Sequence, residues 1–150
     1  MPSLRPRTLA AGTALLGAIS LLTAAMLYVS VPENPPGDGF AAGIAAIFAV
    51  VCAVAGFIAL AEAGLLFLVT RLWNPTARAQ RFLTGGAVAG SLSVVLLAVP
   101  VLVARSFDVL IPGPPWGLGI GLVLVPVGAV CSALGVVFRL LDGSRTEARA

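Results

Sequence analysis

The stretch FAAGIAAIFAVVCAVAGFIALAEAGLLFLVT, residues 40–70, decides the fold of this chain, because Glu62 is its one charged residue. About 20 apolar residues in a helix cross a hydrocarbon core of roughly 30 Å, so the stretch predicts a transmembrane helix. At a rise of about 1.5 Å per residue this helix would be about 46 Å long. It would exceed the hydrocarbon thickness by roughly half, so we expect it to tilt or to protrude.

The composition of the whole chain agrees with this prediction. Of its 150 residues, 59% are hydrophobic and only 10% are charged, and the mean hydropathy is +1.08. Such a chain has too little polar surface to cover a soluble globule, so it needs the lipid bilayer as its solvent. All nine basic residues are Arg and the net charge is only +3. Basic residues so few, lying at the membrane plane, exclude nucleic acid as the expected partner.

Windows of about 20 residues identify the membrane spans. The chain contains four apolar segments, separated by stretches rich in Pro, Gly and polar residues: 8–31, 40–70, 82–104 and 116–138. The sequence therefore predicts an all-α integral membrane protein, with residues 1–150 forming a single four-transmembrane-helix bundle.

The distribution of Arg predicts the orientation. If the amino terminus is cytoplasmic, Arg105 is the one arginine outside, and eight lie inside: Arg5, Arg7, Arg71, Arg78, Arg81, Arg139, Arg145 and Arg149. This asymmetry follows the positive-inside rule and predicts a multi-pass protein of the inner cell membrane with both termini cytoplasmic. On that side Arg71, Arg78 and Arg81 are candidates for binding the phosphates of anionic lipids.

The first span has an alternative interpretation as a cleaved signal peptide. Arg5 and Arg7 precede an apolar run, and Thr23-Ala24-Ala25 resembles a cleavage site. Against cleavage, the apolar run continues through residues 26–29 without a polar region before the supposed cut. We therefore expect the first span to be retained.

Two short matches suggest a duplicated hairpin. VCAVAG around Cys52 resembles VCSALG around Cys131 at an offset of 79, and Arg7, Leu9 and Gly12 match Arg81, Leu83 and Gly86 at an offset of 74. The alternatives are a true duplication, which would give two parallel two-helix repeats, and chance similarity in a chain built from few residue types.

Small residues and prolines indicate how the helices would pack. In lipid, small side chains let helix backbones approach closely. The candidate packing positions in the third and fourth spans are Gly86, Gly90, Gly117, Gly121, Gly128 and Gly135. Pro100 and Pro126 lie within spans, where we expect each to kink its helix and to shape the bundle, with a moving or cavity-lining segment as the alternative.

Glu62 is the candidate functional residue, because an acid inside lipid costs several kcal/mol unless it is paired or neutralised. If it lies deep, it should face the bundle interior and serve as a proton or cation site. The offset of 79, however, aligns Leu60 with Arg139, where the fourth span reaches the cytoplasm. On that alignment we expect Glu62 near the inner boundary, where Arg71 or Arg78 could keep it ionised.

Two function classes follow. The first, which we favour because the spans hold few polar groups for a solute, is a non-catalytic subunit or accessory protein that binds a membrane partner or its own copy. The second is a small transporter or channel using Glu62. An enzyme is not expected, since no nucleophile with a base or pair of acids is present. The chain has no His, and Cys52 and Cys131 lie in different spans without a second cysteine nearby. We therefore expect no metal and no cofactor.

Overall fold

The chain folds into four long helices. The computed structural model describes residues 6–31, 39–72, 77–107 and 115–147. Its helices are α1 (Pro6–Ser30), α2 (Phe40–Leu72), α3 (Ala77–Phe107) and α4 (Pro115–Glu147), and these ranges contain no strand. Each helix is long and apolar enough to cross a membrane. The predicted all-α class and the four membrane-spanning segments are therefore confirmed.

The helix ends differ from the predicted span ends. α3 begins five residues before position 82, and α4 continues nine residues past position 138. Hydropathy locates only the part of a helix that lies in hydrocarbon, whereas backbone hydrogen bonding continues into water when no Pro intervenes. The connecting stretches 32–38, 73–76 and 108–114 lie outside the described residues.

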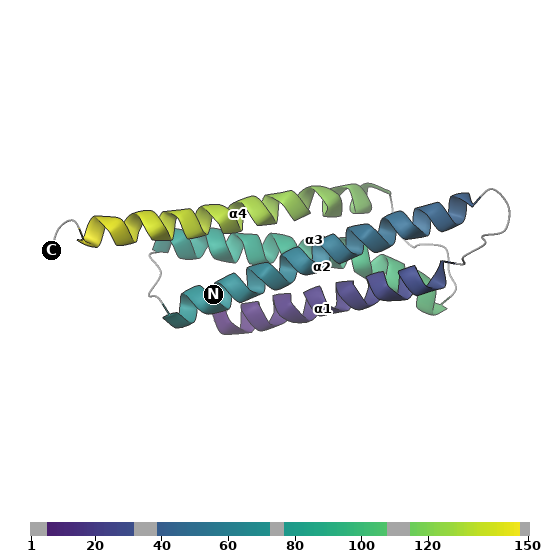
Figure 1. The fold of residues 1–150 in the computed structure, drawn as a ribbon, viewed down its shortest axis with the longest axis horizontal. Helices are drawn as coiled ribbons and strands as arrows, with labels where there is room; N and C mark the ends of the chain where they lie inside the picture. Colours follow the sequence, from purple (N-terminus) through teal and green to yellow (C-terminus); the bar gives the residue numbers. More distant parts are fainter. Residues whose placement is uncertain (1–5, 32–38, 73–76, 108–114, 148–150) are drawn as a thin grey trace.

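The helices form two antiparallel hairpins (Figure 1). α1 packs along α2, and α3 packs along α4. α2 and α3 also contact each other, whereas α1 and α4 make no mutual contact within the described ranges. The bundle is thus a rhombus in cross-section, with α2 and α3 on its short diagonal. A side chain on the inner face of α2 consequently meets both α3 and α4.

Glycines hold the first hairpin together. A Cβ atom placed on Gly17 of α1 would lie 3.0 Å from the Gly56 carbonyl oxygen of α2, and one on Gly56 would lie 2.9 Å from the Gly17 carbonyl oxygen. The hydroxyl of Ser20 adds a hydrogen bond of 2.7 Å to the Cys52 carbonyl of α2. The two backbones are therefore nearly in contact, as expected for helices that associate without a hydrophobic driving force.

The second hairpin repeats this arrangement along what we call the α3–α4 seam. Gly121, Gly128 and Gly135, seven residues apart on α4, each face α3. Their neighbours on α3 include Leu97 opposite Gly121 and Leu83 opposite Gly135. A seven-residue repeat keeps one stripe of a helix against its partner, so the seam runs through most of the span.

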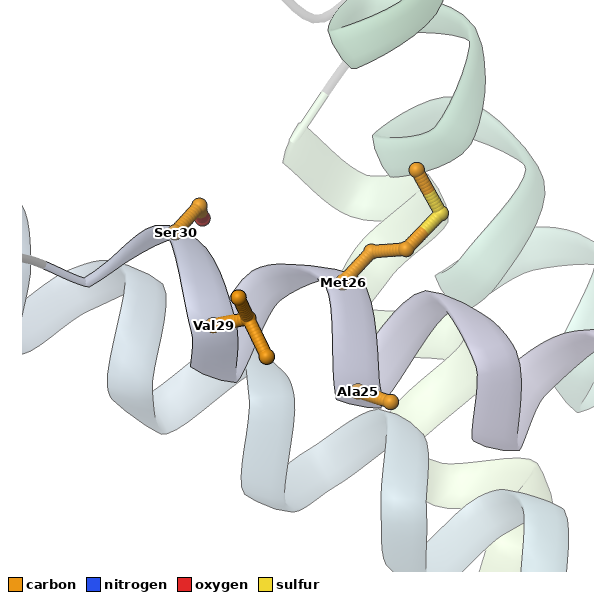
Figure 2. A pocket seen from close by; sticks show the side chains of 4 residues that line it. All are labelled: Ala25, Met26, Val29 and Ser30. Atoms are coloured by element: carbon orange, nitrogen blue, oxygen red, sulfur yellow. The ribbon is translucent and has the colours of Figure 1, made fainter.

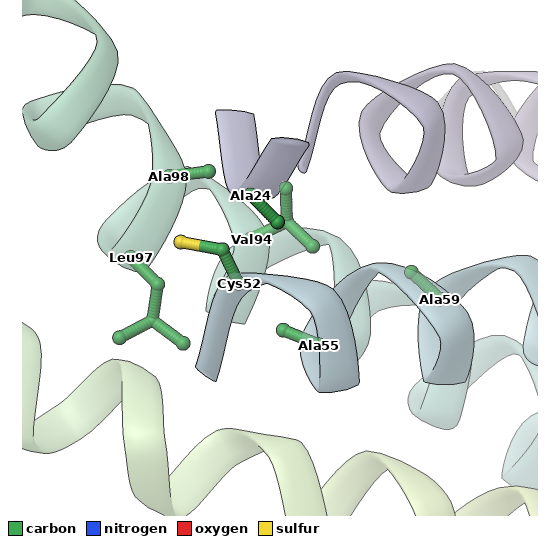
Figure 3. Close-up of a cluster of buried hydrophobic side chains, with 7 residues drawn as sticks. All are labelled: Ala24, Cys52, Ala55, Ala59, Val94, Leu97 and Ala98. Carbon is green, nitrogen blue, oxygen red and sulfur yellow. The ribbon is translucent and has the colours of Figure 1, made fainter. Parts of the chain in front are cut away.

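Small apolar residues fill the interior. One cluster joins α1, α2 and α3 through Ala24, Cys52, Ala55, Ala59, Val94, Leu97 and Ala98 (Figure 3). A second cluster, nearer the start of α3, contains Ala10, Leu66, Val69, Leu83 and Ala87. Large apolar side chains such as Leu22, Val50 and Val123 point outward on all four helices. Large apolar side chains outside and small ones inside are the reverse of the arrangement in a soluble protein, and they give the apolar surface that contact with hydrocarbon requires.

The arginines whose side chains are described gather at one end of the bundle, which we call the arginine end. It is formed by the start of α1, the end of α2, the start of α3 and the last turns of α4, and it holds Arg7, Arg71, Arg78, Arg81 and Arg139. The remaining four arginines lie outside the described residues or have side chains that are not described.

The two cysteines lie at different levels of the bundle. Cys52 packs with Val94 and Leu97 of α3, whereas Ser132, next to Cys131, contacts Gly86 of α3. Eight or more residues of α3 separate these contacts, which is about 12 Å or more along the helix. The offset of 79 therefore does not relate residues of equal depth. The offset of 74 does, because Thr13 of α1 lies against Ala87 of α3.

The glycine contact in the first hairpin yields a stability prediction. We expect Gly17→Leu to lower the free energy of unfolding by about 1–3 kcal/mol, because the new side chain would overlap α2. Gly12→Leu is the matched control, since no described atom lies within 4 Å of a Cβ at that position. The measurement is reversible unfolding in mixed micelles. Equal effects of the two substitutions would contradict the close approach of α1 and α2.

Candidate functional site

Glu62 is buried in the bundle interior. Its side chain is 3% exposed and reaches from α2 towards α3 and α4. A Cβ atom placed on Gly90 of α3 would collide with Oε2 of Glu62, and one placed on Gly128 of α4 would lie 2.7 Å from Oε1. The carboxyl group thus occupies the space that two ordinary side chains would fill. We call Gly90 and Gly128 the glycine seat.

The depth expected from the sequence alignment is wrong. Gly90 lies near the middle of the apolar segment Arg78–Val103, and Gly128 near the middle of Trp116–Leu141. Glu62 is nine residues from Arg71 along α2, which is about 13 Å. The alignment failed because its offset of 79 does not preserve depth. The acid lies well inside the apolar part of the bundle, where neither Arg71 nor Arg78 faces it.

The carboxyl group has no hydrogen-bond partner. Neither Oε1 nor Oε2 is hydrogen-bonded within the described part of the chain, and the buried hydroxyl of Ser132 is unpaired as well. Ser132 lies one turn along α4 from Gly128 and is a close neighbour of the carboxyl group. The two groups sit side by side without the geometry of a hydrogen bond. A small rotation of either side chain would let the hydroxyl donate to the carboxyl oxygen.

Glu62 belongs to a polar layer that includes residues of all four helices, namely Thr13, Glu62, Ser91 and Ser132. The Thr13 hydroxyl lies 2.9 Å from the Ser91 hydroxyl, and it donates to the Leu9 carbonyl of its own helix at 3.0 Å. Ser91 donates to the Ala87 carbonyl at 2.7 Å. Thr13 and Ser91 are thus satisfied, whereas Glu62 and Ser132 are not.

α3 and α4 approach each other closely at the glycine seat. A Cβ on Gly128 would lie 3.2 Å from the Gly90 nitrogen and 3.3 Å from the Gly86 carbonyl oxygen. The space left by the missing side chains is filled by the carboxyl group from the third helix, α2. An ionised, unpaired carboxylate at such a position costs several kcal/mol, so it requires a proton or a cation.

The arginines predicted to bind lipid lie at the arginine end. Arg71, Arg78 and Arg81 are all exposed. The Arg71 guanidinium carbon lies 5.8 Å from the centroid of the Phe67 ring on the same helix. An aromatic ring beneath a guanidinium group holds it near the membrane interface.

The prolines and Gly117 lie away from Glu62. Pro100 and Pro126 are both inside continuous helices, and Pro126 is exposed on the outer face of α4. Gly117 does not pack: no described atom lies within 4 Å of a Cβ there, unlike the other five glycines proposed for packing. Gly117 is near the start of α4, beyond the last glycine contact of the seam, so the packing prediction fails there.

Two apolar depressions on the bundle surface do not involve Glu62. One lies at the end of α1 and is lined by Ala25, Met26, Val29 and Ser30 (Figure 2). The other is a groove between α1 and α2, lined mainly by alanines together with Tyr28. Among the residues that line these two depressions, the Tyr28 phenol is the one ionisable group.

The structure gives the cysteines no catalytic setting. Cys52 is fully buried and Cys131 is half-buried, and both are free thiols. Among the described residues no three His, Cys, Asp or Glu side chains come close enough to hold a metal ion.

Sequence patterns identified the parts of the site but not their assembly. Glu62, Gly90 and Gly128 were each singled out, but for unrelated reasons. Ser132 was not among the predicted site residues. The informative feature is that an acid on α2 lies at the same level as a pair of glycines in the next hairpin. Recognising this feature requires the register between the helices to be known.

Comparison of the chain with protein-family models, with curated proteins and with solved structures finds no match.

The seat predicts an energetic coupling between Glu62 and Gly90. We expect Gly90→Ala to reduce the free energy of unfolding by about 1–3 kcal/mol, because the methyl group displaces the carboxyl group. In a Glu62→Ala background the same substitution should cost less, giving a coupling energy of about 0.5–3 kcal/mol. The measurement is a double-mutant cycle of unfolding in micelles.

Gly85→Ala is the control for this cycle, because a Cβ at Gly85 meets no described atom. It should show no coupling to Glu62→Ala. Additive effects of Gly90→Ala and Glu62→Ala would contradict the placement of the carboxyl group in the seat.

Proposed function

We propose that this small multi-pass membrane protein is a transporter or channel in which Glu62 binds a proton or small cation. Four helices apolar enough to span a bilayer make it an integral membrane protein. The observation that carries the functional proposal is the burial of Glu62, unpaired, in the glycine seat. An acid in lipid that faces the bundle interior is by default a functional group.

The burial of Glu62 changes the balance between the two function classes. The accessory-subunit hypothesis was favoured because the spans hold few polar groups for a solute, and the expectation that water and arginine surround the acid counted against the transporter. At 3% exposure and about 13 Å from Arg71, the carboxyl group has neither. A purely structural role would be served better by an apolar side chain of similar volume, since an unpaired buried charge is destabilising. The proposed transport role supplies a reason for an acid at this position.

The proposed orientation places the arginine end in the cytoplasm. The support is the positive-inside rule applied to the clustered arginines. On this proposal the exposed Arg71, Arg78 and Arg81 bind phosphates of anionic lipids at the inner leaflet of the cell membrane, each contributing about 1 kcal/mol. Both termini would then be cytoplasmic.

Transport by Glu62 is tested in proteoliposomes. We expect Glu62→Gln to abolish ion flux driven by a proton, Na⁺ or K⁺ gradient, because the amide keeps the shape of the side chain but carries no negative charge and does not exchange a proton. Thr70→Val is the matched control on α2: its hydroxyl bonds only to the Leu66 and Phe67 carbonyls of its own helix, so flux should persist. Wild-type protein that moves none of these ions would contradict the proposal.

A second candidate function is an accessory subunit of a membrane complex. The observation that favours it is a set of glycines with open space where a side chain would be, namely Gly12, Gly43, Gly64, Gly85 and Gly119. Small residues on a lipid-facing surface permit close approach by a further helix. The proposed partner in this role is another, larger membrane protein.

Co-purification separates these possibilities. In mild detergent from native membranes, the accessory role predicts a stoichiometric larger partner that is lost in Gly64→Leu, whose new side chain would block the approach. Gly56→Leu serves as the contrast, because it disturbs the internal α1–α2 contact instead. A monomer or a clean homodimer would argue against the accessory role.

A further inference from the structure

We infer that the ligand of Glu62 is a proton and not a metal cation. This inference rests on the proposed function and narrows it to one kind of ion. Three features of the described residues carry it: the space around the carboxyl group, the supply of oxygen ligands, and the charges that face the site.

The space around the carboxyl group is already occupied. Oε2 lies against the backbone of α3 at Gly90, and Oε1 lies against the backbone of α4 at Gly128. The two backbones are themselves in contact beside it, since a Cβ on Gly128 would lie 3.2 Å from the Gly90 nitrogen. A metal cation would have to part α3 from α4 to enter between these groups. A proton adds no comparable volume.

The supply of oxygen ligands is also too small for a metal cation. Hard cations such as Mg²⁺ and Ca²⁺ take about six to eight oxygen ligands at about 2.0–2.6 Å. Near the carboxyl group the one free side-chain oxygen is the hydroxyl of Ser132. The hydroxyls of Thr13 and Ser91 lie 2.9 Å apart, and each has a carbonyl of its own helix within hydrogen-bond distance, Leu9 for Thr13 and Ala87 for Ser91.

Backbone carbonyls do not supply the oxygen ligands that a metal cation would still need. Carbonyls inside a helix accept the N–H group four residues later, so few are available as ligands. Pro100 and Pro126 each remove one such N–H, which frees the carbonyls of Leu96 and Leu122. Both are six residues from the glycine seat, about 9 Å along the helix. They are too far from Glu62 to complete a coordination shell.

The described groups at the level of Glu62 are neutral. Gly90 of α3 and Gly128 and Ser132 of α4 lie beside the carboxyl group, and Thr13 of α1 and Ser91 of α3 belong to the same polar layer. Each arginine with a described side chain is at least six residues along its helix from the nearest member of the seat or polar layer: Arg7, Arg71, Arg78, Arg81 and Arg139. No described charge therefore competes with a proton for the carboxylate. When the proton leaves, the Ser132 hydroxyl is the nearest donor to the resulting charge.

The test is infrared difference spectroscopy of the full chain in lipid nanodiscs, which detects the carbonyl band of a protonated carboxyl group. Titration is followed in Na⁺, K⁺, Ca²⁺ or the bulky organic cation N-methylglucamine. The band of Glu62 is assigned as the one that disappears in Glu62→Gln and shifts in Glu62→Asp. The Asp variant keeps the assignment possible if the Gln variant does not fold.

We expect the Glu62 band to appear on acidification with the same midpoint in every salt. A metal cation that binds in competition would instead lower the apparent proton affinity by about tenfold for each tenfold rise in its concentration. Such competition by any of the metal cations would overturn the inference, as would a band that does not titrate between about pH 4 and pH 10.

The two experiments distinguish failure of the proposed transport role from failure of the inference that the ligand is a proton. If wild-type proteoliposomes carry no Glu62-dependent flux while the band titrates independently of salt, the transport role is wrong and the proton site stands. If flux depends on Glu62 but follows Na⁺, K⁺ or Ca²⁺ instead of protons, the transport role stands and the inference is wrong.

Discussion

The close approach of α3 and α4 at Gly90 and Gly128 is the constraint on which the centre of the bundle depends. In hydrocarbon there is no gain from hiding apolar side chains, so helices associate through dispersion contacts between closely spaced backbones. At the glycine seat this approach leaves a gap beside the seam that only a side chain from α2 can reach. The side chain placed there is Glu62. Its position therefore results from the packing of three helices.

The treatment of polar side chains elsewhere in the bundle makes Glu62 exceptional. The hydroxyls of Thr23, Thr70 and Thr84 donate to carbonyls one turn earlier in their own helices. Ser93 and Ser20 donate across helix contacts to the Gly121 and Cys52 carbonyls. Each of these groups is satisfied within the protein, as an apolar solvent demands. Glu62 and Ser132 are adjacent and unsatisfied. Because unpaired buried polar groups cost free energy, their presence at this one site calls for a functional explanation.

The fold could be predicted from the sequence because hydropathy alone specifies it. Four runs of apolar residues and their polar separators determine the number of helices, and no long-range information is needed. The pair Asn74-Pro75 has the pattern of a helix start and predicts that the third helix begins before the membrane, whereas the extension of α4 past position 138 was not predicted, since hydropathy does not report where helical hydrogen bonding stops in water. The site could be predicted only as separate residues. Bringing Glu62 to Gly90 and Gly128 requires the register between hairpins, and the repeated VC motif indicated a register that is wrong by many residues.

The hydrogen bond between Ser20 and Cys52 shows where the excess length of α2 lies. α2 is 33 residues long, as is α4, whereas α1 is 25, and this bond relates the two helices of the first hairpin. Counting from it, α2 extends about two residues beyond the end of α1 and about six residues beyond its start, so most of the excess lies at the arginine end (Figure 1). Glu62 nevertheless lies inside the bundle, because it is ten residues before the end of α2 at Leu72. Its contacts with Gly90 and Gly128, which hydropathy does not report, bring the acid against the backbones of two other helices.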